Sequence, residues 1–162
     1  MEELSLLTPK CTLVPANFYN PASSRQTLGE VVVLDDADVV KAAEVPQYEA
    51  VLLYAAPSEG SDALPELWYL LRDLPHIRDY NRILASWKDG RLFLGIAQGG
   101  TLLLANSYEA PDFTTAEYYV FLAMKSLQLN PEVSSIYFRH PIGAEDEMSL
   151  YRYFKSVEYL DA

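Results

Sequence analysis

The chain has 162 residues, half of them hydrophobic, and its 23 acidic and 12 basic residues give a formal net charge of −11. A chain of this length forms one domain or two small lobes, and it can bury a core without disulfides or metal ions. Because the negative charge repels phosphate backbones and no Lys/Arg cluster offsets it, the composition disfavours nucleic-acid binding.

The sequence carries no sign of export or of membrane insertion. Its single cysteine, Cys11, cannot form an intramolecular disulfide, which fits a reducing compartment. The first ten residues (MEELSLLTPK) have acids where a signal peptide has basic residues, and no run reaches 18 apolar residues. We therefore expect a cytoplasmic protein without membrane contacts.

The first part of the chain predicts short elements. Residues 11–15 (CTLVP) predict a strand that ends at a proline, and residues 22–28 predict a short helix that Gly29 ends. Residues 30–34 (EVVVL) predict a β-branched strand before an acidic turn, whereas residues 39–45 are ambiguous.

Two clearer patterns follow. Residues 50–56 (AVLLYAA) are continuously apolar, which is typical of a central strand covered on both faces. Asp62 then has the position of a helix N-cap, and Pro75 ends that helix. One face of the helix carries Leu64, Leu67, Trp68 and Leu71. Residues 76–80 are expected to form a short strand.

The stretch 82–109 predicts three antiparallel strands joined by two tight turns. The turns KDG (88–90) and QGG (98–100) supply residues that reach positive φ at low steric cost. Leucine and isoleucine partly alternate between the turns. Such a sheet cannot cover both of its faces, so we expect helices to follow it.

Two helix–strand units complete the predicted fold. Thr114 and Glu117 form a capping-box pattern at the start of a helix that Asn130 and Pro131 end. A strand is expected at 133–139, a helix at about 145–156 and a final strand at 157–160.

The second half therefore has the order β-β-β-α-β-α-β, which predicts an α/β fold with a five-stranded mixed sheet and helices on its faces. This is the ribonuclease-H-like order found in the lobes of actin-type ATPases. The first half predicts a reduced α/β lobe. We expect the two lobes to comprise residues 1–80 and 81–162.

Several segments are similar to those of a known family. They are TLVP at 12–15 with Phe18 and Tyr19, AVLLYAAP at 50–57, LLLANSY at 102–108, TAE at 115–117 and VEYL at 157–160. Together they resemble a family of uncharacterised bacterial proteins with an actin-like ATPase fold, across the chain from about Cys11 onward. The resemblance implies that fold, but no activity and no catalytic residues.

The resemblance also implies differences in length. Members of the family carry further strands before the TLVP-like segment and usually a helix between their lobes. Because this sequence begins almost at TLVP and leaves no room for such a helix at 80–82, the resemblance implies an incomplete first lobe or a shortened chain.

Actin-type ATPases hold nucleotide phosphates in the turn between their first two strands. The equivalent segment here, WKDGRL (87–92), has one glycine and no Ser or Thr, so it favours a plain hairpin over a phosphate site. The second turn has more glycine. Gly99, Gly100 and Thr101 are candidates for weak nucleotide (ATP) binding between the lobes, although a hairpin is the favoured interpretation.

The sequence gives little support to metal-dependent chemistry. Nucleases of this fold class need a carboxylate in the first strand, and residues 83–87 contain none. Asp35, Asp36 and Asp38 are possible ligands of a hard cation, but the pattern favours a solvated acidic turn.

The two histidines complete the metal candidates. His140 near the acids at 145–147 is better explained by the dipole of the following helix. A metal-dependent hydrolase would require His76, His140 and an acid to converge in space.

Aromatic residues give the remaining functional indication. An exposed subset of the tryptophans and tyrosines would form a protein interface. The candidates are Trp68, Trp87, Tyr108, Tyr118, Tyr119, Tyr137, Tyr151, Tyr153 and Tyr159. We predict a protein without a cofactor, catalytic residues or a metal site that acts by binding another protein or itself; weak nucleotide binding is the alternative.

Overall fold

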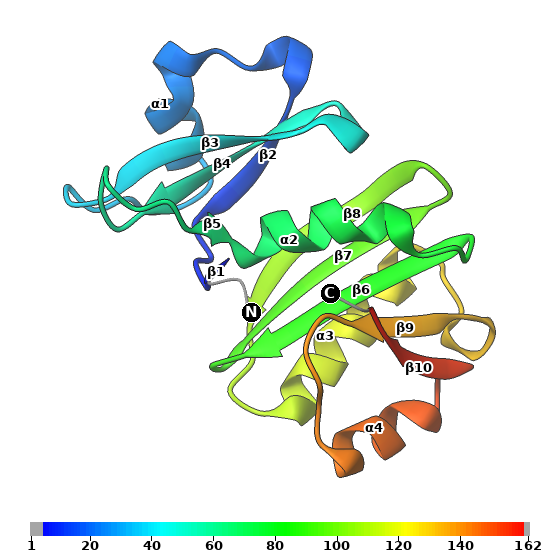
Figure 1. Cartoon of the computed structure of the whole chain (residues 1–162). Coiled ribbons are helices and arrows are strands. Elements are labelled where there is room, and N and C mark those ends of the chain that lie inside the picture. The colour runs from blue at the N-terminus through cyan, green and yellow to red at the C-terminus, as the bar shows by residue number, and fades with distance from the viewer. Residues whose placement is uncertain (1–4, 161–162) are drawn as a thin grey trace. The chain divides into compact units, whose positions relative to one another are not determined.

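The computed structural model describes residues 5–160, in two compact units that divide between Tyr69 and Leu70. Each unit has its own sheet (Figure 1). The division falls inside helix α2 (Glu66–Asp73).

The first unit is built on a three-stranded antiparallel sheet. Strand β4 (Ala50–Ala56) lies between β2 (Cys11–Pro15) and β3 (Val39–Val45), and six of its seven residues are buried. The strand at 11–15 and the central position of the apolar run 50–56 are confirmed. Two-residue strands β1 (Ser5–Leu6) and β5 (Leu64–Pro65) pair in parallel.

Short helices connect these strands. They are η1 (Ala16–Phe18), η2 (Pro21–Ser23), α1 (Ser24–Gly29) and η3 (Pro46–Tyr48). Leu28 of α1 is fully buried with Val51, Leu53 and Ala55 of β4, which form the core on one face of the sheet. The helix predicted before Gly29 is therefore confirmed, although it includes the glycine.

The strand predicted at 30–34 is wrong. The N–H groups of Val31 and Val32 both donate to the carbonyl of Leu28, 3.1 Å away, so the end of α1 uses the donors that a strand would need. Val33 is 82% exposed. The strand is β3, formed by the ambiguous segment 39–45, because β propensity yields to local hydrogen bonding and burial.

Two boundaries around α2 also differ from expectation. The helix begins at Glu66, rather than after Asp62, because Leu64 and Pro65 pair with β1. The strand predicted at 76–80 is wrong. Residues Leu74–His76 form the 3₁₀ helix η4, and the N–H of Ile77 donates to the carbonyl of Leu74.

The second unit contains the predicted five-stranded mixed sheet, in the order β10-β9-β6-β7-β8 (Figure 1). Strands β6 (Asn81–Lys88), β7 (Arg91–Gln98) and β8 (Thr101–Glu109) form the expected antiparallel meander. Strand β9 (Ser135–Phe138) lies parallel to β6, and β10 (Ser156–Tyr159) lies parallel to β9.

Helices α3 (Phe113–Ser126) and α4 (Ala144–Tyr151) cover one face of this sheet, and η5 (Pro131–Val133) precedes β9. The main core lies between this face of the sheet and the two helices α3 and α4. Its fully buried members include Ile83, Leu94, Ile96, Ile136 and Phe138. On the other face Leu74 of η4 packs against Gly95, where a Cβ would lie in ordinary van der Waals contact with Leu74 Cδ2, at 3.5 Å.

The N-cap of α3 is Asp112, and the predicted capping box of Thr114 and Glu117 is wrong. The Asp112 carboxylate accepts from the N–H of Thr115 at 2.8 Å, so the helix starts two residues earlier than expected. The last helix is shorter than predicted. It ends at Tyr151 because Ser156 pairs with Ser135 in the sheet.

No helix in the described part of the chain is long and apolar enough to cross a membrane.

The cap assignment predicts different effects for two neighbouring substitutions. Asp112→Ala should lower the melting temperature by a few degrees, because it leaves an N–H of the first turn without its acceptor. Thr114→Ala is the matched control, and it should have little effect because Thr114 is exposed. Circular dichroism melting of both variants checks this.

The same cap predicts a pH dependence. The hydrogen bond from Thr115 lowers the pKa of Asp112, so the stabilisation is present above the ordinary pKa and is lost as the pH falls through the lowered value. The melting difference between wild type and Asp112→Ala should therefore shrink in acid. A larger effect of Thr114→Ala would contradict the assignment.

Candidate functional site

The turn between β6 and β7 is a hairpin, as predicted. Lys88 pairs with Arg91 across the two loop residues, and both Asp89 (φ 51°) and Gly90 (φ 75°) have positive φ. The carbonyl of Gly90 accepts from the N–H of Ala110 at 2.8 Å. The turn therefore stabilises the sheet through the Gly90 carbonyl oxygen. A carbonyl oxygen carries partial negative charge and does not bind phosphate.

The turn between β7 and β8 contains the three candidate nucleotide residues. Gln98 pairs with Thr101, so Gly99 and Gly100 form the two-residue loop of a hairpin. Gly99 has φ 54°, and its N–H donates to the carbonyl of Tyr80 at 2.9 Å. This donor is thus already engaged in supporting the segment before β6. Nucleotide binding by Gly99, Gly100 and Thr101 stays a prediction.

A pocket of about 260 Å³ lies where β6 and β9 begin, beside the segment that this turn supports. Its lining consists of Asp79, Tyr80, Asn81, Val133, Ser134, Ser135 and Lys155. Three of these precede or begin β6, three lie around the start of β9, and Lys155 immediately precedes β10. The amino ends of the three parallel strands β6, β9 and β10 thus place polar side chains together at one end of these strands.

The floor of the pocket is a hydrogen-bonded polar network. The Asn81 amide donates from Nδ2 to Ser134 Oγ at 3.3 Å and accepts at Oδ1 from Gln98 Nε2 at 3.0 Å. Ser134 Oγ in turn donates to the carbonyl of Asn130 at 2.8 Å. These bonds connect β6, β7 and the approach to β9, so the floor is held by several elements.

Sequence reasoning did not find this pocket. Its residues come from three separate segments, and none of them forms a recognisable motif. The available signal was positional, because Asn81, Ser135 and Ser156 each begin a strand of the parallel part of the sheet.

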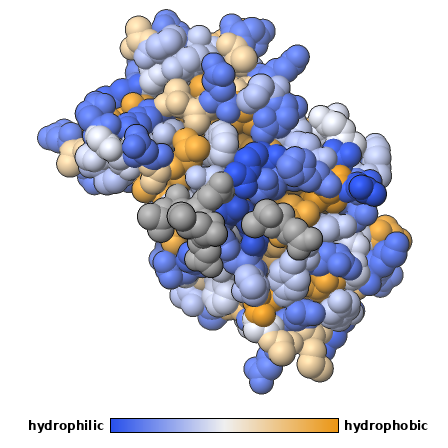
Figure 2. Space-filling view, viewed as in Figure 1, coloured by the Kyte–Doolittle hydropathy of each residue, from blue (hydrophilic) through white to orange (hydrophobic). Residues whose placement is uncertain are grey.

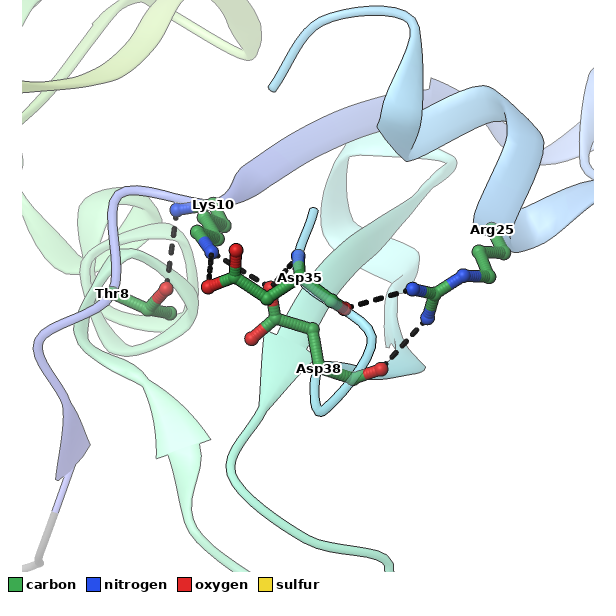
Figure 3. A network of polar contacts seen from close by, with 5 residues as sticks. All are labelled: Thr8, Lys10, Arg25, Asp35 and Asp38. Carbon is green, nitrogen blue, oxygen red and sulfur yellow. Dashed lines mark hydrogen bonds and ion pairs between the residues drawn. The ribbon is translucent and has the colours of Figure 1, made fainter. Parts of the chain in front are cut away.

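The acidic turn of the first unit is held by two basic side chains (Figure 3). Lys10 Nζ lies 2.7 Å from Asp38 Oδ2 and 3.5 Å from Asp35 Oδ2. The Asp38 carboxylate also accepts from the N–H of Asp35, and the Arg25 guanidinium donates to the carbonyls of Asp35 and Asp38. The carboxylates thus neutralise a lysine and close a turn, as the favoured interpretation predicted.

The lysine and the aspartate shift each other's protonation. The hydrogen bond from Lys10 is the main cause that lowers the pKa of Asp38, and the bond to Asp38 is the main cause that raises the pKa of Lys10. Both side chains are accessible to solvent, so the pair fixes the conformation of the turn more than the stability of the fold.

The described residues 5–160 contain no group of three or more His, Cys, Asp and Glu side chains placed to hold a metal ion. His76 lies at the end of η4 and His140 follows β9. The convergence that a metal-dependent hydrolase requires is therefore not found in this part of the chain.

Strand β8 has nine residues and, in the described part of the chain, is an edge strand that pairs with β7 alone. The N–H of Ala110 points toward β7, since it donates to Gly90. Backbone direction alternates from Ala110 back to Leu104, so the N–H groups of Ala105 and Ser107 point away from β7; at Leu103 a bulge interrupts the alternation. No backbone group within residues 5–160 pairs with Ala105 on the outer side.

A side chain protects one of these edge groups. Asn106 Oδ1 accepts from the N–H of Ser107 at 2.8 Å. The N–H of Ala105 is left for another chain, at the end of an apolar part of the strand (LLLA, 102–105). A long edge strand of this kind is a template for an added strand.

Tyrosines continue this edge onto helix α3. Tyr108 of β8 stacks on Tyr119, with ring centroids 4.7 Å apart, and Tyr119 contacts the edge of Tyr118. Tyr118 is 59% exposed, and Leu122, one turn later, is 47% exposed. Figure 2 shows mainly hydrophilic residues with separate hydrophobic patches on the visible face, so continuous apolar surface is restricted.

We call β8 together with Tyr118, Tyr119 and Leu122 the β8–α3 surface. It combines unpaired backbone groups with aromatic side chains that are held in place by one another. The predicted exposed subset of tyrosines exists in this unit, whereas Trp87 is half-buried and donates to the carbonyl of Ala110.

The comparisons agree with this architecture. Residues 4–157 match the family described as protein of unknown function DUF3822, and the chain belongs to that family. No curated protein matches the sequence. A crystal structure from Bacteroides thetaiotaomicron, described as a protein with actin-like ATPase fold and unknown function, is similar with a TM-score of 0.77 and 15% identity.

That similarity covers 94% of this chain and 65% of the Bacteroides chain, so the present chain spans about two thirds of the length of its neighbour. At this identity the likeness shows the fold alone. The expected actin-like ATPase fold, with its five-stranded mixed sheet, is thereby confirmed.

The acidic turn provides a test by titration. Lys10→Met should raise the pKa of the Asp38 carboxyl toward its ordinary value, because the main cause of the lowered pKa is removed. Carboxyl ¹³C NMR measures this directly. Lys41→Met is the matched control, since Lys41 Nζ donates to the backbone carbonyls of Glu59 and Ser61.

The sign of the linked stability effect follows from the lowered pKa. The Asp38 contribution is present above the ordinary carboxyl pKa and is lost as the pH falls through the lowered value. An unchanged Asp38 pKa in Lys10→Met would contradict the pairing, and Ca²⁺-dependent shifts at Asp35 and Asp38 would restore the cation interpretation.

Proposed function

We propose that this DUF3822 member is a non-catalytic protein with an actin-like ATPase fold that binds another protein chain through its β8–α3 surface. The partner is a different protein or a second copy of this chain. The proposal rests mainly on one observation, the nine-residue edge strand whose outward backbone N–H at Ala105 is unpaired within the described residues.

The backbone of β8 supplies the first part of the binding energy. An extended segment that pairs with the outward backbone groups of β8, beginning at Ala105, would extend the five-stranded sheet by one strand. Backbone hydrogen bonds fix the direction of such a segment but carry little sequence information. Specificity must therefore come from side chains beside the edge.

The tyrosines supply that second part. Tyr108 reaches the same side of the sheet as α3, where it stacks on Tyr119. Alternate side chains of an added strand would point toward Tyr118 and Tyr119. Tyrosines bury large areas at low entropy cost, which is why they are frequent among the residues that dominate binding energy.

The charge of the chain indicates the chemistry of a partner. A net charge of −11 favours a partner with basic residues and repels nucleic acids.

We also propose that the protein lies in the cytoplasm, where its single cysteine would stay reduced. Burial raises the pKa of the Cys11 thiol to about 12, so this cysteine serves as an apolar strand residue and not as a nucleophile.

Site-specific photo-crosslinking tests the proposal. A photoreactive phenylalanine analogue in place of Tyr118 should crosslink one defined protein in cells, identified by mass spectrometry. The same analogue in place of Tyr159, an exposed tyrosine of β10 at the opposite edge of the sheet, is the matched control. It should give no such product.

A second variant tests the role of the strand edge. Ser107→Pro removes an N–H that donates to the Asn106 side chain and not to β7, so the sheet should remain intact. The crosslink from position 118 should then decrease several-fold. A crosslink that is unchanged by Ser107→Pro, or equal yields from both positions, would contradict the β8–α3 surface.

Calorimetry with Mg-ATP distinguishes the alternative. The proposal predicts no binding in the micromolar range. Micromolar affinity that Gly99→Ala and Gly100→Ala abolish, without unfolding the chain, would instead establish the weak nucleotide site at the β7–β8 turn.

A further inference from the structure

We propose that the pocket at the amino ends of β6, β9 and β10 binds a small aliphatic α-amino acid as a zwitterion. The ligand's carboxylate would pair with Lys155 and its ammonium group with Asp79. This site is independent of the β8–α3 surface, since none of its lining residues belongs to that surface.

The size of the pocket limits the ligand. At about 260 Å³ it lies below the roughly 300–1,000 Å³ typical of sites for drug-sized molecules. It corresponds to the space of about eight or nine water molecules. A free amino acid fits this volume, whereas a nucleoside triphosphate does not.

The charges of the lining are of opposite sign and are not paired with each other. No ion pair joins Asp79 and Lys155, and within residues 5–160 no carboxylate forms an ion pair with the Lys155 ammonium. A pocket with one separate anion and one separate cation is complementary to a molecule that carries both charges.

Asp79 is positioned by its surroundings. The Tyr137 hydroxyl points to Asp79 Oδ2 at 3.4 Å, and Arg82 Nε donates to the Asp79 backbone carbonyl at 3.0 Å. Burial and the nearby Asp79 charge raise the pKa of Tyr137, so its phenol stays protonated and acts as a donor. The carboxylate is thus oriented while keeping acceptor capacity for an ammonium group.

Lys155 is positioned through its backbone. Its N–H donates to the carbonyl of Ser134 at 2.9 Å and also to that of Pro131 at 3.3 Å. Ser135 Oγ and Ser156 Oγ lie 2.6 Å apart and join β9 to β10 beside it. The base of the Lys155 side chain is therefore fixed, and its flexible stem can place the ammonium group on a ligand carboxylate.

Two exposed apolar side chains favour an aliphatic ligand. Tyr80 is 70% exposed and Val133 is 66% exposed, and both line the pocket. Burying them against a ligand side chain would remove apolar surface from water. The Tyr80 segment is held by the Gly99 N–H, and its ring can contact a ligand ammonium group through its π face.

The experiment is an NMR titration of the ¹⁵N-labelled full chain with L-leucine. Two matched analogues each lack one charge: 3-methylbutylamine has no carboxylate and 4-methylpentanoate has no ammonium group. We expect saturable shifts at Tyr80, Ser135 and Lys155 with a dissociation constant of about 1 mM or lower. Each analogue should bind at least about tenfold more weakly.

Substitutions at the two charges complete the test. Asp79→Asn and Lys155→Met should each weaken leucine binding about tenfold, while spectra away from the pocket stay unchanged. Asp89→Asn and Lys88→Met, on the β6–β7 turn, are matched controls and should have no effect. Absence of saturable shifts, equal binding of an analogue, or shifts outside the pocket would overturn the proposal.

Discussion

The second unit depends on the pairing of β7 with β6 on one side and β8 on the other. Six consecutive residues of β7, from Leu92 to Ala97, are buried, and they contribute to both faces of the sheet. Leu74 packs on the strand at Gly95. The two hairpins have two-residue loops, so they fix the order of these three strands.

This order determines where the rest of the sheet can form. Because β7 is paired on both sides, parallel strands reached through α3 and α4 can add only beside β6 or β8. They add beside β6, in the order β9 then β10, and so leave β8 as the edge. Both features follow from the addition of β9 and β10 beside β6. This strand order leaves the backbone of β8 unpaired on its outer side, and it brings the amino ends of β6, β9 and β10 together at the polar pocket.

Sequence reasoning predicted the parts that local patterns specify. The Asp-Gly and Gly-Gly turns identified both hairpins, and apolar periodicity identified the helix at 113–126. It was wrong where a hydrogen bond at a helix end or the pairing of a strand decides. Val31–Val33 have strand propensity, but the N–H groups of Val31 and Val32 donate to Leu28 at the end of helix α1. The N-cap of α3 is Asp112, whose carboxylate accepts from the N–H of Thr115.

The candidate sites also include one part that the sequence predicted and one part that it did not. Exposed tyrosines were predicted as a class, but only the three-dimensional structure shows that Tyr108, Tyr119 and Tyr118 form a continuous contact beside an edge strand. The pocket was not predicted, because Asp79 and Lys155 are 76 positions apart in the sequence (155 minus 79). The parallel pairing of β6, β9 and β10 brings them into the lining of one pocket.

Amide hydrogen exchange along β8, measured by NMR in a dilute monomer, tests the open edge most directly. The N–H groups that point away from β7, above all that of Ala105, should exchange rapidly, while those of Leu104, Asn106 and Tyr108, which face β7, should exchange slowly. Equal protection of both sets in the isolated chain would show that the outer side of β8 is already occupied, and would contradict the proposed binding surface.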